Sequence, residues 1–200
     1  MDNNKLKEIK TILVGRSGTG KTNLINAITG QKFSINEAST IASSFVEKKI
    51  TKKNKDYLLA IWDTAGQEKY RALTKIFIKD SKIVIFVYSI DNRKSFEEID
   101  YWVETVKTIL GDKPVFGLAG NKIDLFQVEQ VTAEEGKNKA KEIGAIFKST
   151  SAKTKVGINE FIEKLVEEYA KKEGDISDDN KSAKLSSRKF KEKNNSKCCK

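Results

Sequence analysis

Short apolar runs alternate along this chain with segments whose apolar residues recur at helical spacing. The apolar runs predict β-strands at Ile9–Gly15, Ser44–Thr51, Tyr57–Thr64, Lys82–Ser89, Val115–Gly120 and Ala145–Ser149. The helical spacing predicts α-helices at Lys21–Gly30, Arg93–Leu110, Thr132–Ile143 and Gly157–Lys172. The polar, aperiodic stretch Gln31–Phe45 between the first helix and the second strand is predicted to be a loop.

The order of these segments predicts the fold class. Ser44–Thr51 and Tyr57–Thr64 are separated by a short polar turn, which predicts a hairpin. The later strands alternate with helices, and this order is typical of a parallel sheet with helices on both faces. We therefore expect an α/β fold with a mostly parallel six-stranded sheet and one antiparallel edge strand. The loops that follow the parallel strands should meet at one edge of the sheet, where ligands bind in such folds.

The basic charge is concentrated at the C-terminal end. The chain has 200 residues and a formal net charge of +10. From Lys181 to Lys200, eight basic residues stand against the single acid Glu192, so this segment contributes +7. Apolar residues become sparse after Lys172, and such a segment cannot bury enough surface to offset the entropy cost of ordering. We predict an N-terminal extension (1–8), a globular domain (9–172) and a disordered basic tail (173–200).

The composition excludes several classes of protein. No apolar stretch approaches the 18 residues of a membrane span, and residues 1–10 lack the apolar core of a signal peptide. We therefore expect a cytosolic protein. There is no histidine, and the two cysteines, Cys198 and Cys199, are adjacent, so neither a tetrahedral metal site nor a disulfide framework is expected.

A phosphate-binding motif follows the first predicted strand. Gly15–Thr22 matches G-x-x-x-x-G-K-[ST] between a predicted strand and a predicted helix. Glycines let backbone N–H groups converge on an anion, the helix N-terminus adds a favourable dipole, and Lys21 neutralises phosphate oxygens. The hydroxyl of Thr22 is placed to ligate Mg²⁺. The alternative is a chance glycine-rich turn, which the flanking strand and helix count against.

A second motif indicates which base is bound. Asn121–Asp124 (N-K-x-D) follows a strand that should end at the same sheet edge. The carboxylate of Asp124 can accept hydrogen bonds from N1–H and the 2-amino group of guanine. Adenine offers neither donor, and a buried carboxylate without a partner is costly. Alone this pattern is also that of a solvated polar turn, but together with the phosphate-binding motif it predicts a guanine nucleotide.

In these two motifs the chain resembles the Ras superfamily of small GTPases and, within it, the Rab family. The resemblance runs from about Ile9 to Lys172. Besides the two motifs above, it rests on Trp62–Glu68 (W-D-T-A-G-Q-E) and Thr150–Lys153 (T-S-A-K), with further similarity at Tyr70–Ala72 and Phe86–Tyr88. It implies a three-layer P-loop GTPase fold (a G domain) that binds GTP or GDP with Mg²⁺ and hydrolyses GTP.

The resemblance also implies roles for individual residues. The metal ligands would be Thr22, Thr40 and, through water, Asp63, and the catalytic residues would be Gln67, which orients the attacking water, together with Lys21 and Thr40. The nucleotide-binding set would be Ser17, Gly18, Thr19, Gly20, Lys21, Thr22, Asn23, Phe33, Thr40, Gly66, Asn121, Lys122, Asp124, Ser151, Ala152 and Lys153. No arginine is obviously supplied within the chain for the transition state, so slow turnover that depends on an activating protein is expected.

Several of these residues have a simpler alternative interpretation. Thr40 could be an ordinary loop residue, Phe33 a core anchor and Asp63 a helix cap. Trp62 and Trp102 are expected to serve packing or a partner surface rather than chemistry. Arg16 is expected to be solvated, although it could touch phosphate. Two stretches differ from the usual Rab pattern, Ile41–Phe45 and Phe77–Ser81, and they leave the subfamily and the partners open.

The C-terminal Cys198 and Cys199 resemble the double-cysteine ends on which Rab proteins receive two geranylgeranyl groups. Two lipid chains with basic residues anchor a protein stably to a membrane; the alternative is a solvated tail with free thiols. By resemblance we expect vesicular traffic at the cytosolic face of an intracellular membrane. The expected partners are an exchange factor, a GTPase-activating protein, a GDP-dissociation inhibitor, the prenylation machinery and effectors.

Other functional classes fit the sequence less well. A nucleotide-binding scaffold without turnover is disfavoured because Gln67, Thr40 and Asp63 are intact. A nucleic-acid binder is disfavoured because the basic charge lies in the tail, which has Phe190 as its sole aromatic residue. We expect no nucleic-acid partner and a monomeric protein.

Overall fold

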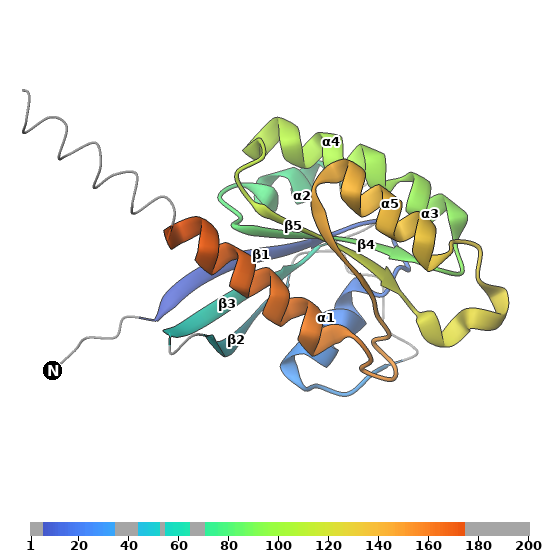
Figure 1. Ribbon diagram of the computed structural model, residues 1–200, viewed down its shortest axis with the longest axis horizontal. Coiled ribbons are helices and arrows are strands. Elements are labelled where there is room, and N and C mark those ends of the chain that lie inside the picture. The colour runs from blue at the N-terminus through green and yellow to red at the C-terminus, as the bar shows by residue number, and fades with distance from the viewer. Residues whose placement is uncertain (1–5, 35–43, 53–54, 65–70, 175–200) are drawn as a thin grey trace, which may run out of the picture.

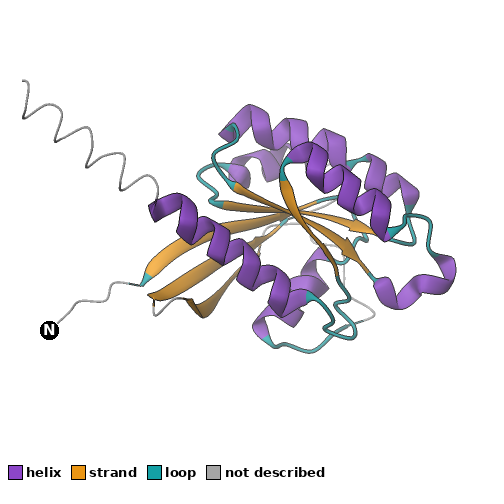
Figure 2. Ribbon diagram, in the orientation of Figure 1, coloured by secondary structure: helices purple, strands orange, loops and turns teal. Residues whose placement is uncertain are grey.

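The computed structural model describes residues 6–34, 44–52, 55–64 and 71–174. Its six-stranded sheet has the order β2-β3-β1-β4-β5-β6, and Figure 2 shows the strands between layers of helices. The strands are β1 (Lys7–Val14), β2 (Ser44–Lys52), β3 (Lys55–Asp63), β4 (Ile83–Ser89), β5 (Val115–Asn121) and β6 (Ala145–Ser149). Only the β2–β3 pair is antiparallel within this sheet. The predicted α/β class, the hairpin and the antiparallel edge strand are confirmed.

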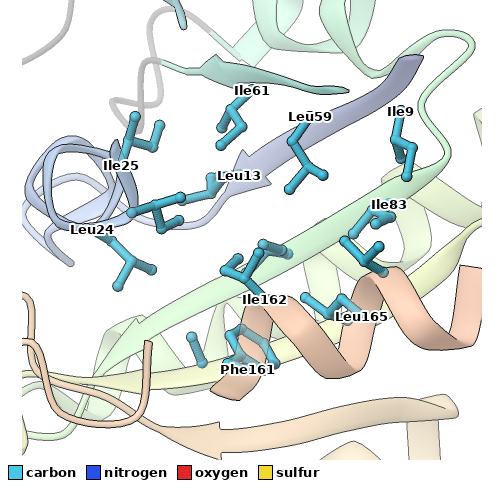
Figure 3. Close-up of a cluster of buried hydrophobic side chains, with 14 of the residues drawn as sticks. Ile9, Leu13, Leu24, Ile25, Leu59, Ile61, Ile83, Phe161, Ile162 and Leu165 are labelled. Carbon is cyan, nitrogen blue, oxygen red and sulfur yellow. The ribbon is translucent and has the colours of Figure 1, made fainter. Parts of the chain in front are cut away.

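Helices cover both faces of the sheet (Figure 1). They are α1 (Lys21–Thr29), α2 (Arg71–Ile78), α3 (Arg93–Glu97), α4 (Ile99–Leu110), the 3₁₀-helix η2 (Ile123–Val128), α5 (Ala133–Ile143) and a C-terminal helix over 158–174. Side chains of α1 and the C-terminal helix form one core with the sheet; Figure 3 shows Leu24, Ile25, Phe161, Ile162 and Leu165 on the same face of the sheet. Side chains of α2, α4 and α5 form the second core, on the opposite face.

The burial of β4 explains its sequence. Every residue of this central strand is buried, because it pairs with a parallel strand on each side and is covered by helices on both faces. Such a strand is read as a continuous apolar run rather than an alternating one. Trp102 of α4 is fully buried in the second core, so the prediction that it serves packing is confirmed. Trp62 contacts two aromatic rings: the Phe45 ring is tilted against it at a centroid distance of 5.2 Å, and the Phe77 ring is stacked on it at 5.5 Å.

The helices differ from the sequence prediction in three places. Helix α2 is absent from the prediction, because it is only eight residues long and the preceding Lys69-Tyr70 offers no N-cap signal. The single helix predicted over Arg93–Leu110 is divided at Glu98 into α3 and α4. The short helix η2, which begins inside the N-K-x-D motif at Ile123, also has no sequence signal of the usual helical period.

Five parallel strands place the loops that follow them at one edge of the sheet. The segment 15–20 follows β1, and Asp63 ends β3. Asn121 ends β5, and Thr150 follows β6. The sheet edge therefore gathers the motifs that the sequence singles out.

No helix in the described ranges is long and apolar enough to cross a membrane.

Candidate functional site

The glycine-rich loop has a backbone that only glycines allow. Gly15 is pressed against β4, where a Cβ atom would lie 2.1 Å from the carbonyl oxygen of Val87. Gly18 and Gly20 have φ angles of 79° and 89°, in the left-handed region that favours glycine. Gly20 is also the N-cap of α1 and offers no side chain to cap it. The first N–H groups of α1 are therefore presented to this loop, which is the arrangement that binds anions.

Lys21 lies at the centre of the loop with its ammonium buried. The residue is 6% exposed, and its Nζ donates to the carbonyls of Gly15 and Arg16 at 2.9 and 3.0 Å. Burial lowers the pKa of Lys21 to about 8, and the nearby Asp63 carboxylate opposes this shift. A buried cation held by carbonyls of its own loop is suited to an anion with more than one negative charge.

Thr22 and Asp63 bring two oxygen donors together beside Lys21. The Thr22 hydroxyl donates to Oδ2 of Asp63 at 2.6 Å, and Asp63, at the end of β3, is buried. A hydroxyl and a carboxylate are the hard ligands that Mg²⁺ prefers, and this ion takes its remaining ligands from water and phosphates. The donor set therefore fits Mg²⁺ bound together with a phosphate group. Within the described ranges, no group of three or more His, Cys, Asp or Glu side chains could hold a metal ion.

Asn121 connects the phosphate loop with the loops beyond β5 and β6. This fully buried side chain donates from Nδ2 to the Thr19 carbonyl at 2.9 Å. Its Oδ1 accepts from the Thr150 hydroxyl at 3.2 Å and from the Ala152 N–H at 3.3 Å. One amide thus fixes three loops relative to one another.

Asp124 is held in place by the loop that follows β6. Its Oδ1 accepts from the Ser151 hydroxyl at 2.6 Å, and the Ser151 oxygen accepts from the Thr154 N–H at 3.1 Å. Lys122 adopts a left-handed backbone with φ 65°, and its Nζ lies 3.9 Å from Oδ1 of Asp91. Lys153 is exposed. The carboxylate of Asp124 is therefore oriented by a buried hydroxyl, as a selective hydrogen-bond acceptor must be.

Asn23 and Phe33 lie where α1 passes into the loop before β2. The Asn23 amide binds the backbone of Ser34 on both sides: Nδ2 donates to the carbonyl at 2.8 Å, and Oδ1 accepts from the N–H at 2.9 Å. This pair fixes the chain directly after Phe33. Phe33 is 37% exposed, so the alternative that it anchors the core is wrong.

Other predicted site residues lie outside the described ranges. They are Thr40, Gly66, Gln67, Cys198 and Cys199. Their assigned roles stay predictions.

The structure also adds contacts that the sequence pattern did not indicate. The Arg16 side chain is 39% exposed, so it is partly solvated as expected, and its guanidinium also donates to the Glu98 carboxylate. The Ser34 backbone clamp and the Asp91 carboxylate beside Lys122 are further additions. Glu98, Ser34 and Asp91 belong to no recognisable motif, and Arg16 occupies a variable position of the phosphate-binding motif. Only an unusual charge in the phosphate loop, at Arg16, could have drawn attention to one of them.

Comparison with known families gives one match over this region. A model described as the Ras family matches residues 10–171. The match includes both the glycine-rich loop and the segment that holds Asp124, and it covers four fifths of the chain.

Proposed function

Because the chain belongs to the Ras family, we propose that it is a Rab-like switch that alternates between GTP-bound and GDP-bound states. As a Ras-family protein it is a small GTPase, and members of this family bind guanine nucleotide with Mg²⁺ and hydrolyse GTP. We propose in addition that it is Rab-like, that it acts in vesicular traffic and that the individual residues have the roles given below. These proposals rest on the motif resemblance together with the geometry described above.

One observation carries the proposal: the buried Asn121 amide joins the phosphate loop to the loop that orients Asp124. Lys21 marks the phosphate end of the site and Asp124 the base end. Because a single rigid side chain links the two ends, the separation between a cation and a base-selecting carboxylate is fixed before any ligand binds. Such preorganisation favours one ligand that contains both a polyphosphate and a purine.

At the phosphate end, the chain itself supplies charge and donors. The ammonium of Lys21 and the N–H groups at the start of α1 would neutralise the β- and γ-phosphates. Thr22 and Asp63 would hold Mg²⁺, which when bound neutralises charge on the phosphate oxygens. The protein has no covalent step to perform in phosphoryl transfer, so its contribution is positioning and charge stabilisation.

At the base end, Asp124 would select guanine. Its carboxylate would accept from N1–H and the 2-amino group of guanine. By resemblance to the family, the residues around the guanine would be Asn121, Lys122, Ser151, Ala152 (through its N–H) and Lys153. An adenine nucleotide would leave the carboxylate without donors. A site built around such a hydrogen bond rejects the wrong ligand by about 10⁴-fold.

The switch itself is proposed by resemblance. Thr40 and Gly66 would contact the γ-phosphate, so GTP orders the segments around them and hydrolysis releases them. Gln67 would orient the attacking water. Turnover would be slow without a partner, and an arginine from an activating protein would add roughly 10³–10⁵-fold.

The tail would attach the switch to a membrane. We propose that Cys198 and Cys199 are geranylgeranylated and that the basic residues of 181–200 strengthen binding to the anionic cytosolic leaflet. Mass spectrometry of the protein from its native cells tests the modification, and free thiols on both cysteines would contradict it. Imaging a fusion that leaves the C-terminus free would identify the membrane, and a protein that stays wholly cytosolic would contradict the attachment.

The central test measures nucleotide binding by the purified full chain in Mg²⁺ buffer. We expect fluorescent mant-GDP and mant-GTP to bind at least 10³-fold more tightly than mant-ATP. Equal affinity for ATP, or no uptake of guanine nucleotide by folded protein, would reject the proposed function. Hydrolysis is tested separately by single-turnover assays of the wild type and Gln67→Leu, and equal rates would remove Gln67 from the mechanism.

A further inference from the structure

An ion pair ties the phosphate loop to a helix junction. The guanidinium of Arg16, the second residue of the glycine-rich loop, donates through Nη1 to Oε1 of Glu98. Glu98 lies between α3 and α4, far from the loop in sequence. The two side chains are 39% and 23% exposed, so the pair is only partly screened by solvent. Arg16 occupies a variable position of the G-x-x-x-x-G-K-[ST] signature, and Glu98 lies outside all of the motifs.

The backbone of Arg16 supplies one of the two loop carbonyls that orient Lys21; the other is that of Gly15. The Arg16 carbonyl accepts from Nζ of Lys21 at 3.0 Å and from the Thr19 hydroxyl at 3.0 Å. The preceding residue, Gly15, is pressed against the backbone of β4. Residue 16 is therefore fixed on its N-terminal side by a strand and, through its side chain, by Glu98. If the Arg16 carbonyl moved, the ammonium of Lys21 that is hydrogen-bonded to it would be displaced as well.

Glu98 is itself held in a rigid part of the fold. Its N–H donates to the carbonyl of Lys94 at 3.1 Å, and its carbonyl accepts from the N–H of Trp102 at 3.3 Å. Trp102 is fully buried in the second core. The backbone of Glu98 is therefore held in place by its neighbours, and a residue that positions another side chain needs such support.

We propose that Glu98 is a positioning residue for the phosphate loop: through Arg16 it fixes one of the two carbonyls that orient Lys21, and so slows the release of bound nucleotide. The inference rests on the proposed function, because it takes the loop to hold the phosphates of a guanine nucleotide. It assigns a role in nucleotide retention to Arg16, at a variable position of the phosphate-binding motif, and to Glu98, which lies outside the motifs.

Long-range electrostatics makes the opposite prediction for one of the two residues. Removing the negative charge of Glu98 makes the neighbourhood of the loop more positive, which on charge alone would strengthen the binding of an anion. Removing the positive charge of Arg16 would weaken it. Positioning predicts instead that both changes weaken binding, because each one releases the same carbonyl. The direction of the Glu98 effect therefore separates the two explanations.

The experiment follows the release of mant-GDP from the full chain in Mg²⁺ buffer after addition of excess unlabelled GDP. We compare the wild type with Arg16→Gln, Glu98→Gln and the double variant. A partly exposed ion pair changes an equilibrium constant by up to about fivefold, so we expect each single variant to release nucleotide about two- to fivefold faster. The double variant should be no faster than either single one, since both changes break one contact.

A matched control separates positioning from a general loss of stability. Arg93 and Glu135 form another Arg–Glu pair, with both side chains 39% exposed, and Glu135 also accepts from the N–H of Thr132 at the start of α5. Glu135→Gln should therefore lower the free energy of unfolding at least as much as Glu98→Gln. It should leave the release rate of mant-GDP within about 1.5-fold of the wild type.

The inference is overturned if Glu98→Gln releases nucleotide at the wild-type rate or more slowly, if the effects of Arg16→Gln and Glu98→Gln multiply in the double variant, or if Glu135→Gln accelerates release equally. These outcomes all require a wild-type protein that binds mant-GDP. Failure of the wild type to bind would reject the proposed function instead, so the two failures are distinguishable.

Discussion

The replacement Asn121→Ala removes the one side chain that joins the two ends of the candidate site. It deletes three hydrogen bonds, to the Thr19 carbonyl at 2.9 Å, from the Thr150 hydroxyl at 3.2 Å and from the Ala152 N–H at 3.3 Å. The amide also packs against the phosphate loop, since a Cβ atom on Gly20 would lie 2.7 Å from Nδ2. Alanine therefore removes a hydrogen-bond partner from each of these three groups and leaves a small cavity beside the loop.

The expected cost follows from these contacts. Each intramolecular hydrogen bond contributes about 1 kcal/mol, so the three together are worth about 3 kcal/mol. The cost applies to the folded, nucleotide-bound state relative to the unfolded chain and free nucleotide. It divides between two measurable quantities, the free energy of unfolding without nucleotide and the free energy of nucleotide binding. If it fell entirely on binding, the affinity would drop about 10²-fold.

Two measurements on one preparation test this expectation. Urea unfolding of the nucleotide-free protein gives the first quantity, and mant-GDP titration gives the second. Thr150→Val is the matched control, because it deletes only the hydroxyl bond to Asn121 and should cost about 1 kcal/mol in total. The reasoning is refuted if the two losses of Asn121→Ala sum to less than about 1 kcal/mol, or if Thr150→Val costs as much as Asn121→Ala.

Three further predictions concern buried groups. Because burial lowers the pKa of Lys21 to about 8, the unfolded chain binds the extra proton between pH 8 and 10.5. The free energy of unfolding of nucleotide-free wild type should therefore rise relative to Lys21→Met by about 1.4 kcal/mol per pH unit in this window, and parallel pH profiles would contradict it. The buried hydroxyl of Tyr88 has no hydrogen-bond partner among the described residues, so Tyr88→Phe should leave the free energy of unfolding in urea unchanged or raise it by up to about 1 kcal/mol. A decrease of more than about 1 kcal/mol would show that the hydroxyl has a hydrogen-bond partner. Gly136→Ala places a Cβ atom 2.4 Å from the Tyr88 hydroxyl and 2.5 Å from the Phe147 ring, and should cost about 1–3 kcal/mol in the same assay, whereas a neutral result would mean that both rings can move.

The sheet and the ends of the site could be predicted because they depend on local patterns. The continuous apolar run of β4 requires burial on both faces, and the glycines at 15, 18 and 20 are needed where the backbone turns sharply or approaches a neighbouring strand. Parallel connections then place the motifs after β1 and β5 at the same edge. No three-dimensional information was needed for these steps.

The remaining features depend on contacts between distant segments. Glu98 divides one amphipathic helix into two, and nothing in the apolar period marks that position. Its pairing with Arg16 joins residues 82 positions apart, which no local pattern can indicate. Likewise, the two hydrogen bonds between the Asn23 amide and the Ser34 backbone form only once the loop after α1 has folded back on the helix. Side-chain pairs of this kind are set by tertiary packing, which the order of residues does not show.

The contacts around the phosphate loop come from three different parts of the fold. Gly15 meets the backbone of β4, the Thr19 carbonyl is held by Asn121 at the end of β5, and Arg16 is held by Glu98 between α3 and α4. A loop fixed from three sides pays little ordering entropy when an anion binds. The buried Asn121 contact should therefore decide whether the site forms at all, whereas the partly exposed Arg16–Glu98 pair should modulate how long a nucleotide stays. If the cost of Asn121→Ala falls entirely on binding, its effect of about 10²-fold exceeds the roughly two- to fivefold effect of the Arg16 and Glu98 variants by more than tenfold.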